Sequence, residues 1–239
     1  MKLTVCLSWL SYLLPPACPL CGGPFSKLSA EPFCPRCMAN ITLLPQAQCS
    51  CCALPFVCSS SLSPHLCGRC IQNRPAYAVT YAAALYRGEL RSAISRFKFQ
   101  QYPNLDRPLA GLLLKCLPVQ LDVDLLVPVP LHPARLRERT YNQALLLARE
   151  LGRGRCLPTA HDALRKCRST TPQQSLTAAQ RRANLRGAFV LNREVTGRKI
   201  LLVDDVMTTG VTVDLCSQVL LSGGAARVDV AVVARAPLA

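Results

Sequence analysis

The chain has few acidic side chains, few aromatic ones and no long hydrophobic run. Its 13 Asp and Glu face 28 Lys and Arg over 239 residues, which gives a formal net charge of +15. Aromatic residues make up only 5% of the chain, so the composition does not support extensive stacking on nucleic-acid bases. No apolar stretch approaches the roughly 18 residues that a membrane-spanning helix needs. We therefore expect no membrane span and a surface that attracts polyanions.

The N-terminus also lacks a clear export signal. Residues 1–14 contain an apolar run, but it carries one Lys, has no clear small-x-small cleavage site and meets Pro15 and Pro16 at once. This matters because the 15 cysteines could otherwise indicate a disulfide-rich secreted protein. We predict a cytoplasmic protein whose cysteines hold metal.

Eight of the cysteines form four Cys-x2-Cys pairs in the first third of the chain. Two thiolates on such a tight turn can take adjacent corners of the tetrahedron that Zn²⁺ prefers. Twelve residues separate the first two pairs and fourteen separate the last two, so we predict two structural Zn²⁺ sites, each built from two consecutive pairs. The predicted ligands are Cys18, Cys21, Cys34 and Cys37 in the first site, and Cys49, Cys52, Cys67 and Cys70 in the second.

Other arrangements of the cysteines are open at this point. The pairs could interleave, Cys51 could bind metal in place of Cys52, and His65 could replace a cysteine. Structural disulfides or a redox pair fit four regularly spaced pairs less well. The cysteines outside the pairs are predicted to be small buried hydrophobic residues: Cys6, Cys58, Cys116, Cys156, Cys167 and Cys216.

A short apolar strand, an acid pair and a hydroxyl-rich turn occupy residues 198–212. Residues 200–203 form an unbroken apolar run, which is typical of a parallel strand covered on both faces. Asp204 and Asp205 follow, and a Thr-Thr-Gly-Val-Thr turn then leads into an apolar helix. Carboxylates accept hydrogen bonds from vicinal ribose hydroxyls, and N–H groups at a helix N-terminus favour phosphate. The pattern predicts a site for a ribose 5-phosphate.

This segment resembles the phosphoribosyl pyrophosphate (PRPP) loop of the type I phosphoribosyltransferases. The resemblance implies an α/β fold, with a parallel sheet and helices on both of its faces. It also implies PRPP bound together with Mg²⁺, which prefers oxygen ligands. The residues implicated in PRPP binding are Asp204, Asp205, Thr208, Thr209, Gly210 and Thr212.

Composition divides the chain near Pro75. The cysteine pairs end before it and a strand-like run covers residues 76–86. We therefore predict a small double zinc-ribbon module over residues 1–74 and a phosphoribosyltransferase-like domain over residues 75–239.

Further elements follow in the second part. We predict an amphipathic helix over residues 89–99, because its apolar residues recur on one face. A strand over residues 124–131 is predicted to end in a loop, with a helix over residues 144–151 after it. Thr177 can N-cap a later helix.

Residues 132–199 form the basic part of the chain, with fifteen Lys and Arg against four Asp and Glu. Arginines clustered where a strand meets a helix can clamp pyrophosphate or a nucleic-acid backbone. A solvated charge run is the alternative interpretation. The side chains predicted to contact pyrophosphate or nucleic acid are Lys98, Arg135, Arg137, Arg139, Arg168 and Arg182.

Taken together, these features resemble the ComF family. The resemblance is carried by the cysteine pairs, the segment VPVPLHPARLRERTYNQA, the pattern between Arg168 and Phe189, and VDDVMTTG. It implies a bacterial cytoplasmic protein in natural competence or DNA utilisation, one that handles incoming single-stranded DNA. DNA-uptake or recombination proteins are the partners that this resemblance implies.

One position departs from the purine-salvage relatives. Those enzymes often carry a third acid where this chain has Thr208, and such an acid can assist proton transfer at the base. Two functions therefore stay open. One is a DNA-handling protein with a PRPP-type site, and the other is an active phosphoribosyltransferase acting on an unidentified nucleobase or amine.

Overall fold

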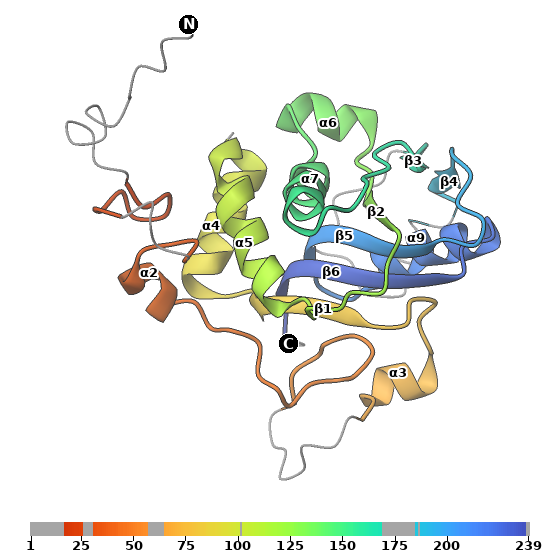
Figure 1. The fold of residues 1–239 in the computed structure, drawn as a ribbon, viewed down its shortest axis with the longest axis horizontal. Helices are drawn as coiled ribbons and strands as arrows, with labels where there is room; N and C mark the ends of the chain where they lie inside the picture. The colour runs from red at the N-terminus through yellow and green to blue at the C-terminus, as the bar shows by residue number, and fades with distance from the viewer. Residues whose placement is uncertain are drawn as a thin grey trace, which may run out of the picture.

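The centre of the fold is a four-stranded parallel sheet in the order β1-β6-β5-β2 (Figure 1). The computed structural model describes residues 17–25, 31–56, 65–100, 102–168, 185 and 187–237. The strands of the sheet are β1 (Thr80–Leu85), β2 (Leu125–Pro128), β5 (Lys199–Met207) and β6 (Arg227–Arg235). Every pairing in this sheet is parallel, as the resemblance implied.

The apolar run in β5 is buried on both faces of the sheet. Successive side chains of a strand point to opposite faces, so Ile200 and Leu202 enter one core while Leu201 and Val203 enter the other. All four side chains are fully buried. An unbroken apolar run, rather than an alternating one, is the pattern that such a strand requires.

Helices cover both faces of the sheet (Figure 1). The helices α4 (Gly88–Phe99), α5 (Asp106–Cys116) and α7 (Gln143–Arg155) pack on one face. The other face carries α9 (Val211–Ser222) and the antiparallel hairpin of β3 (Leu164–Lys166) and β4 (Phe189–Leu191). The remaining short elements are α2 (Pro35–Ala39), α3 (Gly68–Gln72), the 3-10 turn η1 (Pro103–Leu105) and α6 (Pro133–Arg139).

The cysteine-rich part of the chain contacts both faces and one edge of the sheet. Cys34 and Cys37 belong to the core beneath α4 and α5, whereas Cys49 and Cys52 belong to the core beneath α9. Between them, residues 42–44 run along the edge strand β1. The N–H of Leu44 donates to the Ala83 carbonyl at 3.1 Å, and the N–H of Leu85 donates to the Thr42 carbonyl at 2.8 Å. These bonds satisfy polar groups that an edge strand would otherwise leave unpaired.

The structure corrects several element boundaries. Strand β1 is shorter than the predicted run at residues 76–86, and β2 is shorter than residues 124–131. The loop predicted after β2 contains the helix α6, which carries the three arginines of that segment. The cause is local: His132 caps the helix, since its Nδ1 accepts from the Ala134 N–H at 3.2 Å, and Pro133 occupies the first turn.

The cysteines outside the four pairs and the expected absence of a membrane span can be compared with the structure. Cys216 is buried as predicted, but Cys156 and Cys167 are exposed and Cys116 is half-buried, so burial was the wrong expectation for these three. Cys6, Cys58 and the helix expected after Thr177 lie outside the described residues. Within the part of the chain that the structure describes, no helix combines the length and the apolar character needed to cross a bilayer.

Candidate functional site

Two clusters of four cysteines have the geometry of tetrahedral zinc sites. The sulfur atoms of Cys18, Cys21, Cys34 and Cys37, and separately those of Cys49, Cys52, Cys67 and Cys70, all lie within 4.8 Å of one another. Within them, the Cys21 and Cys34 sulfurs are 3.7 Å apart, as are those of Cys52 and Cys67. A tetrahedron with Zn–S bonds of about 2.3 Å has edges of about 3.8 Å. The clusters therefore fit Zn²⁺, and the consecutive pairing is confirmed.

The second cluster contains neither of the two alternative ligands, Cys51 and His65. Cys52 lies in the cluster, while the Cys51 thiol instead points to the Tyr77 carbonyl at 3.8 Å. The His65 ring stacks on Phe56, with ring centroids 4.1 Å apart and an interplanar angle of 11°. Neither Cys51 nor His65 replaces a cysteine ligand.

A tight turn joins the carboxyl end of β5 to the first residue of α9. Gly210 is the N-cap of that helix and adopts φ 81°, in the left-handed region where a side chain is strained. Thr208 is exposed, and Thr209 and Thr212 are half-buried. The turn thus places backbone N–H groups and hydroxyl groups at the positive end of a helix, where an anion is favoured.

The acid pair lies near the carboxyl end of β5, and Val206 and Met207 separate it from this turn. Asp205 is 6% exposed and its carboxylate pairs with the Lys98 ammonium at 2.9 Å. The Asp204 carboxylate accepts the Asp205 N–H at 2.8 Å. Burial and the neighbouring Asp205 carboxylate raise the pKa of Asp204 to about 7, although Lys98 and Arg139 oppose that rise. The pair therefore holds buried negative charge that an added cation or hydroxyl donor can stabilise.

Lys98 is held against Asp205 by the way α4 ends. The Phe97 carbonyl, one residue before Lys98, accepts from the Tyr141 hydroxyl at 2.7 Å and from the Gln143 amide at 3.2 Å. These bonds tie the last turn of α4 to the start of α7. Burial lowers the pKa of Lys98, but the charge of Asp205, the hydrogen bond to it and the charge of Asp204 together raise it more, so the net shift is upward and the ammonium stays charged.

The predicted basic residues lie at different distances from the acid pair. Arg139 is the arginine whose charge acts directly on Asp204, and its guanidinium lies 4.9 Å from the Phe99 ring centroid. Arg135 pairs with Glu138 at 2.9 Å, on the surface of α6. Arg137 and Arg168 are exposed. Arg182 lies outside the described residues.

Sequence reasoning missed four side chains near the turn. Lys166 on β3 is half-buried and burial lowers its pKa, while the charge of Asp204 acts on it in the opposite direction. Arg235, Arg69 and Tyr77 contact the turn from the side of the second cysteine cluster. They come from segments far apart in the sequence, and no local motif marked them.

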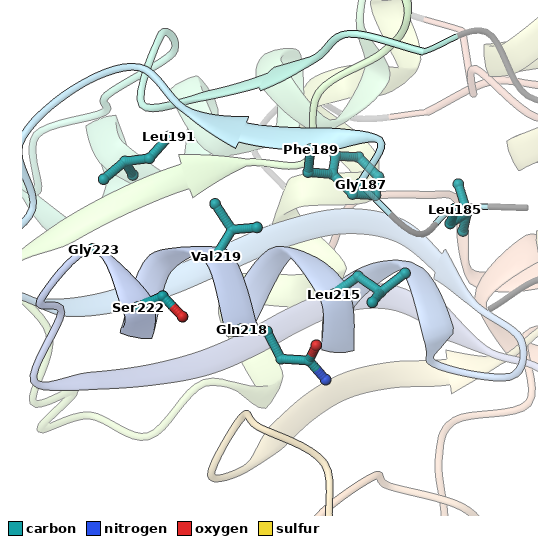
Figure 2. Close-up of a pocket in the computed structure, with 9 residues that line it drawn as sticks. All are labelled: Leu185, Gly187, Phe189, Leu191, Leu215, Gln218, Val219, Ser222 and Gly223. Atoms are coloured by element: carbon teal, nitrogen blue, oxygen red, sulfur yellow. The ribbon is translucent and has the colours of Figure 1, made fainter. Parts of the chain in front are cut away.

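Among the described residues, the cavities on the α9 side of the sheet include two of similar volume. One, of ≈ 500 Å³, lies between the second cysteine cluster and the turn, and includes Arg69, Tyr77, Thr209 and Arg235. The other, of ≈ 480 Å³, is an apolar groove between β4 and α9, where Leu191 and Phe189 face Val219 and Leu215 (Figure 2). The acid pair lines neither of them.

Comparison with known proteins identifies both parts of the chain. A phosphoribosyl transferase domain model matches residues 146–238, and a double zinc ribbon domain model matches residues 9–71. Competence protein F of Haemophilus influenzae is 34% identical over 221 residues, which cover 85% of this chain and 96% of that protein. DNA utilization protein YhgH of Escherichia coli is 35% identical over 225 residues, with 91% and 96% covered.

Two further matches are weaker. Competence protein ComFC of Bacillus subtilis is 31% identical over 160 residues, which cover 65% of this chain and 60% of that protein. Among solved structures, an allosteric regulatory enzyme of purine biosynthesis aligns with 57% of this chain and 29% of its own, at 20% identity and a TM-score of 0.38. That structural likeness is too weak to support an argument by itself.

The matches to the first two relatives cover 85% and 91% of this chain. With its double zinc ribbon and its phosphoribosyltransferase-like sheet, the chain belongs to the ComF family of competence and DNA-utilisation proteins.

Proposed function

We propose that this protein acts in the cytoplasm in natural transformation or DNA utilisation, where it handles incoming single-stranded DNA and carries a PRPP-type site. The observation that supports the site is the acid pair near the carboxyl end of β5, two residues before a turn with a left-handed glycine at the start of α9. The names of the relatives, competence protein and DNA utilization protein, support the cellular process.

In this proposal each part of PRPP has its own contacts. The ribose hydroxyls donate to Asp204 and Asp205, and the 5-phosphate accepts from the turn Thr208–Thr212. The pyrophosphate lies near Lys98 and the arginines of α6, with Mg²⁺ bridging its oxygens. Lys98 already pairs with Asp205, so its charge stands beside the carboxylate to which ribose would bind. Ligand binding would then bring hydroxyl hydrogen-bond donors to two adjacent carboxylates that share the single Lys98 ammonium.

Calorimetry with PRPP and Mg²⁺ tests this site. Wild type is compared with the double variant Asp204→Asn/Asp205→Asn, which keeps the side-chain shape and removes the charge. We expect binding to wild type and none to the double variant, with both proteins folded by circular dichroism. Binding that survives in the double variant would refute the assignment of the acid pair.

The DNA part of the proposal rests on the charge and on a few exposed rings near the site. Phe99 is 58% exposed and Tyr102 is 46% exposed, and the guanidinium of Arg96 lies 4.6 Å from the centroid of the Tyr102 ring. Tyr141 is less suited to stack on a base, because its hydroxyl is bonded to the end of α4. Exposed rings flanked by arginine are the groups that hold unpaired bases and their phosphates.

The salt dependence of single-stranded DNA binding tests this second part. A mixed-sequence oligonucleotide is titrated at increasing salt, and we expect log K to fall steeply and linearly with log salt concentration. A duplex of the same sequence provides the comparison for strand preference. An affinity that does not change with salt would contradict electrostatic capture. DNA-uptake or recombination proteins are the proposed partners of the complex.

An active phosphoribosyltransferase is the second candidate function, and the pKa of Asp204 favours it. A carboxylate with a pKa of about 7 can accept a proton at neutral pH, which the Thr208 hydroxyl cannot do. The reaction would form a bond between a nucleobase or amine nitrogen and C1 of the ribose, and would release pyrophosphate. Its test is pyrophosphate release from Mg²⁺–PRPP with a panel of nucleobases and amines. Pyrophosphate release that requires one of the acceptors would support this function. If no acceptor in the panel causes pyrophosphate release, the result would argue against it.

We also propose that residues 1–74 and 75–239 are the two units of the chain. Limited proteolysis followed by mass spectrometry tests this boundary, since a linker between units is cut first.

A further inference from the structure

Arg235 is a buried cation at the end of β6, and its contacts join distant parts of the chain. It is 2% exposed and is the largest of the fully buried side chains in the described part of the chain. Its guanidinium donates to the carbonyls of Cys52 at 2.9 Å, Met207 at 3.1 Å and Ala236 at 2.8 Å, and also to that of Thr208. A single side chain thus bonds a ligand of the second cysteine cluster and the start of the turn after β5.

The acceptors of Arg235 are neutral, so they leave its positive charge uncompensated. A buried charge is expensive unless an opposite charge lies close by. The second cluster supplies such a charge, because four thiolates around one Zn²⁺ carry a formal charge of about −2. Metal loading of the second cluster and burial of Arg235 therefore support each other electrostatically.

Two further contacts fix the same turn from the same side. In the sequence, Arg69 stands between Cys67 and Cys70 of the second cluster. Its guanidinium donates to the Thr209 carbonyl at 3.4 Å. The Tyr77 hydroxyl lies so close to Gly210 that a Cβ added there would be 3.2 Å from it. Each of the three residues of the turn, Thr208, Thr209 and Gly210, is thus contacted by a residue that packs with the second cluster.

The direction of these bonds matters for an anion. The described peptide bonds are all trans, and in a trans peptide the carbonyl and the following N–H point in opposite directions. By holding the carbonyls of Thr208 and Thr209 toward the second cluster, Arg235 and Arg69 turn the N–H groups of Thr209 and Gly210 away from it. Those are the N–H groups that a phosphate at the turn would accept from.

The first cluster offers an internal comparison. It lies in the core on the opposite face of the sheet, and its segment is reached by Arg96, which donates to the Leu20 carbonyl at 2.9 Å. Arg96 contacts no residue of the turn among its described bonds. Arg96 and Arg235 therefore make the same kind of bond to the two cysteine-rich segments, but only Arg235 continues to the turn.

We propose that Arg235 is a positioning residue that makes phosphate binding at the turn depend on metal in the second cluster and not on metal in the first. The proposal rests on the proposed function of the turn and adds a dependence that the site by itself does not require. Since coupling between two binding events is reciprocal, a phosphate ligand at the turn must also act on the second metal site.

The test uses the full chain loaded with ¹¹³Cd in place of zinc, and ribose 5-phosphate as the probe. Each cluster gives one cadmium resonance, and the variant Cys18→Ser assigns the resonance of the first cluster. We expect ribose 5-phosphate to shift the resonance of the second cluster and to leave that of the first unchanged. Arg235→Lys should retain both resonances, lose the shift and bind ribose 5-phosphate about ten- to a hundredfold more weakly, as expected for loss of hydrogen bonds made by a charged group.

Matched variants separate the possible results. Arg69→Ala changes an exposed side chain and should weaken ribose 5-phosphate binding in the same direction by a smaller factor. Arg96→Lys should leave the affinity for ribose 5-phosphate within about twofold. Its contact with Leu20 is far from the turn, and substitutions at distant sites act independently. Suppose that wild type binds ribose 5-phosphate. If Arg235→Lys then binds it equally well, or if the resonance of the second cluster does not shift, the coupling is refuted but the phosphate site at the turn is retained. If wild type does not bind ribose 5-phosphate, the proposed function of the turn fails and the coupling fails with it.

Discussion

Replacing Asp204 by Asn should stabilise the ligand-free protein at neutral and alkaline pH. Burial and the Asp205 carboxylate raise the pKa of Asp204 from 3.8 to about 7, so the folded protein resists charging this group. A carboxyl whose pKa is raised by folding contributes stability below its unfolded pKa, and that contribution is lost as the pH rises through the folded pKa. Asn cannot ionise and keeps the side-chain oxygen that accepts the Asp205 N–H.

The size of this effect follows from the shift. Each pKa unit corresponds to about 1.4 kcal/mol, so the raised pKa would cost the fold at most about 4 kcal/mol at pH 8 and about 2 kcal/mol at pH 5. Asp204 is only half-buried, and solvent screening reduces these values, so we expect about half of each. The stability difference between Asp204→Asn and wild type should therefore grow by about 1 kcal/mol from pH 5 to pH 8 and level off above pH 7.

Urea unfolding followed by circular dichroism at several pH values measures this difference. Metal release at low pH affects both proteins equally and cancels in the comparison. Asp162→Asn serves as a control, because Asp162 is exposed and its carboxylate pairs with the exposed Arg193 at 3.5 Å, so its substitution should change stability by less than about 0.5 kcal/mol. An Asp204→Asn variant that is less stable than wild type at pH 8, or a difference that does not vary with pH, would show that the acid pair is not strained by its own charge.

Two other substitutions test the surroundings of the acid pair. Lys98→Met should destabilise the protein by about 3 kcal/mol, because it leaves Asp205 buried without its partner, whereas Lys115→Met removes an exposed pair with Glu31 and should cost less than about 1 kcal/mol in the same thermal unfolding assay. Gly210→Ala should cost about 1–2 kcal/mol, because φ is 81° there and the new Cβ would press on Tyr77, and calorimetry should show weaker ribose 5-phosphate binding; unchanged affinity would mean that the turn does not hold the phosphate.

The sequence predicted the parts of the fold that depend on local patterns. The apolar run of β5 could be recognised because a strand buried on both faces needs apolar residues at successive positions, and Leu201 and Leu202 fill opposite cores. The cysteine clusters could be paired because a Cys-x2-Cys turn limits which sulfur atoms can share one ion. The face of α4 formed by Leu90, Ile94 and Phe97 was equally local, and all three are buried.

The errors arose where the outcome depends on tertiary packing. A lone cysteine fits either a core or a surface, and Cys156 and Cys167 are exposed at the positions that follow α7 and β3. The arginines of α6 were assigned to a loop, because the cap formed by His132 is less common than one formed by Ser or Asp. Arg235 could not be found at all, since its bond to Cys52 joins residues 183 positions apart.

The arrangement of Lys98 explains how the fold tolerates two adjacent acids near the carboxyl end of β5. Without a cation, the carboxylates of the buried Asp205 and the half-buried Asp204 would repel each other. Lys98 supplies that cation, and the bonds from Tyr141 and Gln143 to the Phe97 carbonyl hold the end of α4 so that the ammonium reaches Asp205. One ammonium cannot neutralise two carboxylates. The repulsion that Lys98 does not offset, together with burial, raises the pKa of Asp204. A ligand that brings hydroxyl donors or a cation to this pair would relieve the strain, so the same feature that weakens the free protein favours the bound one.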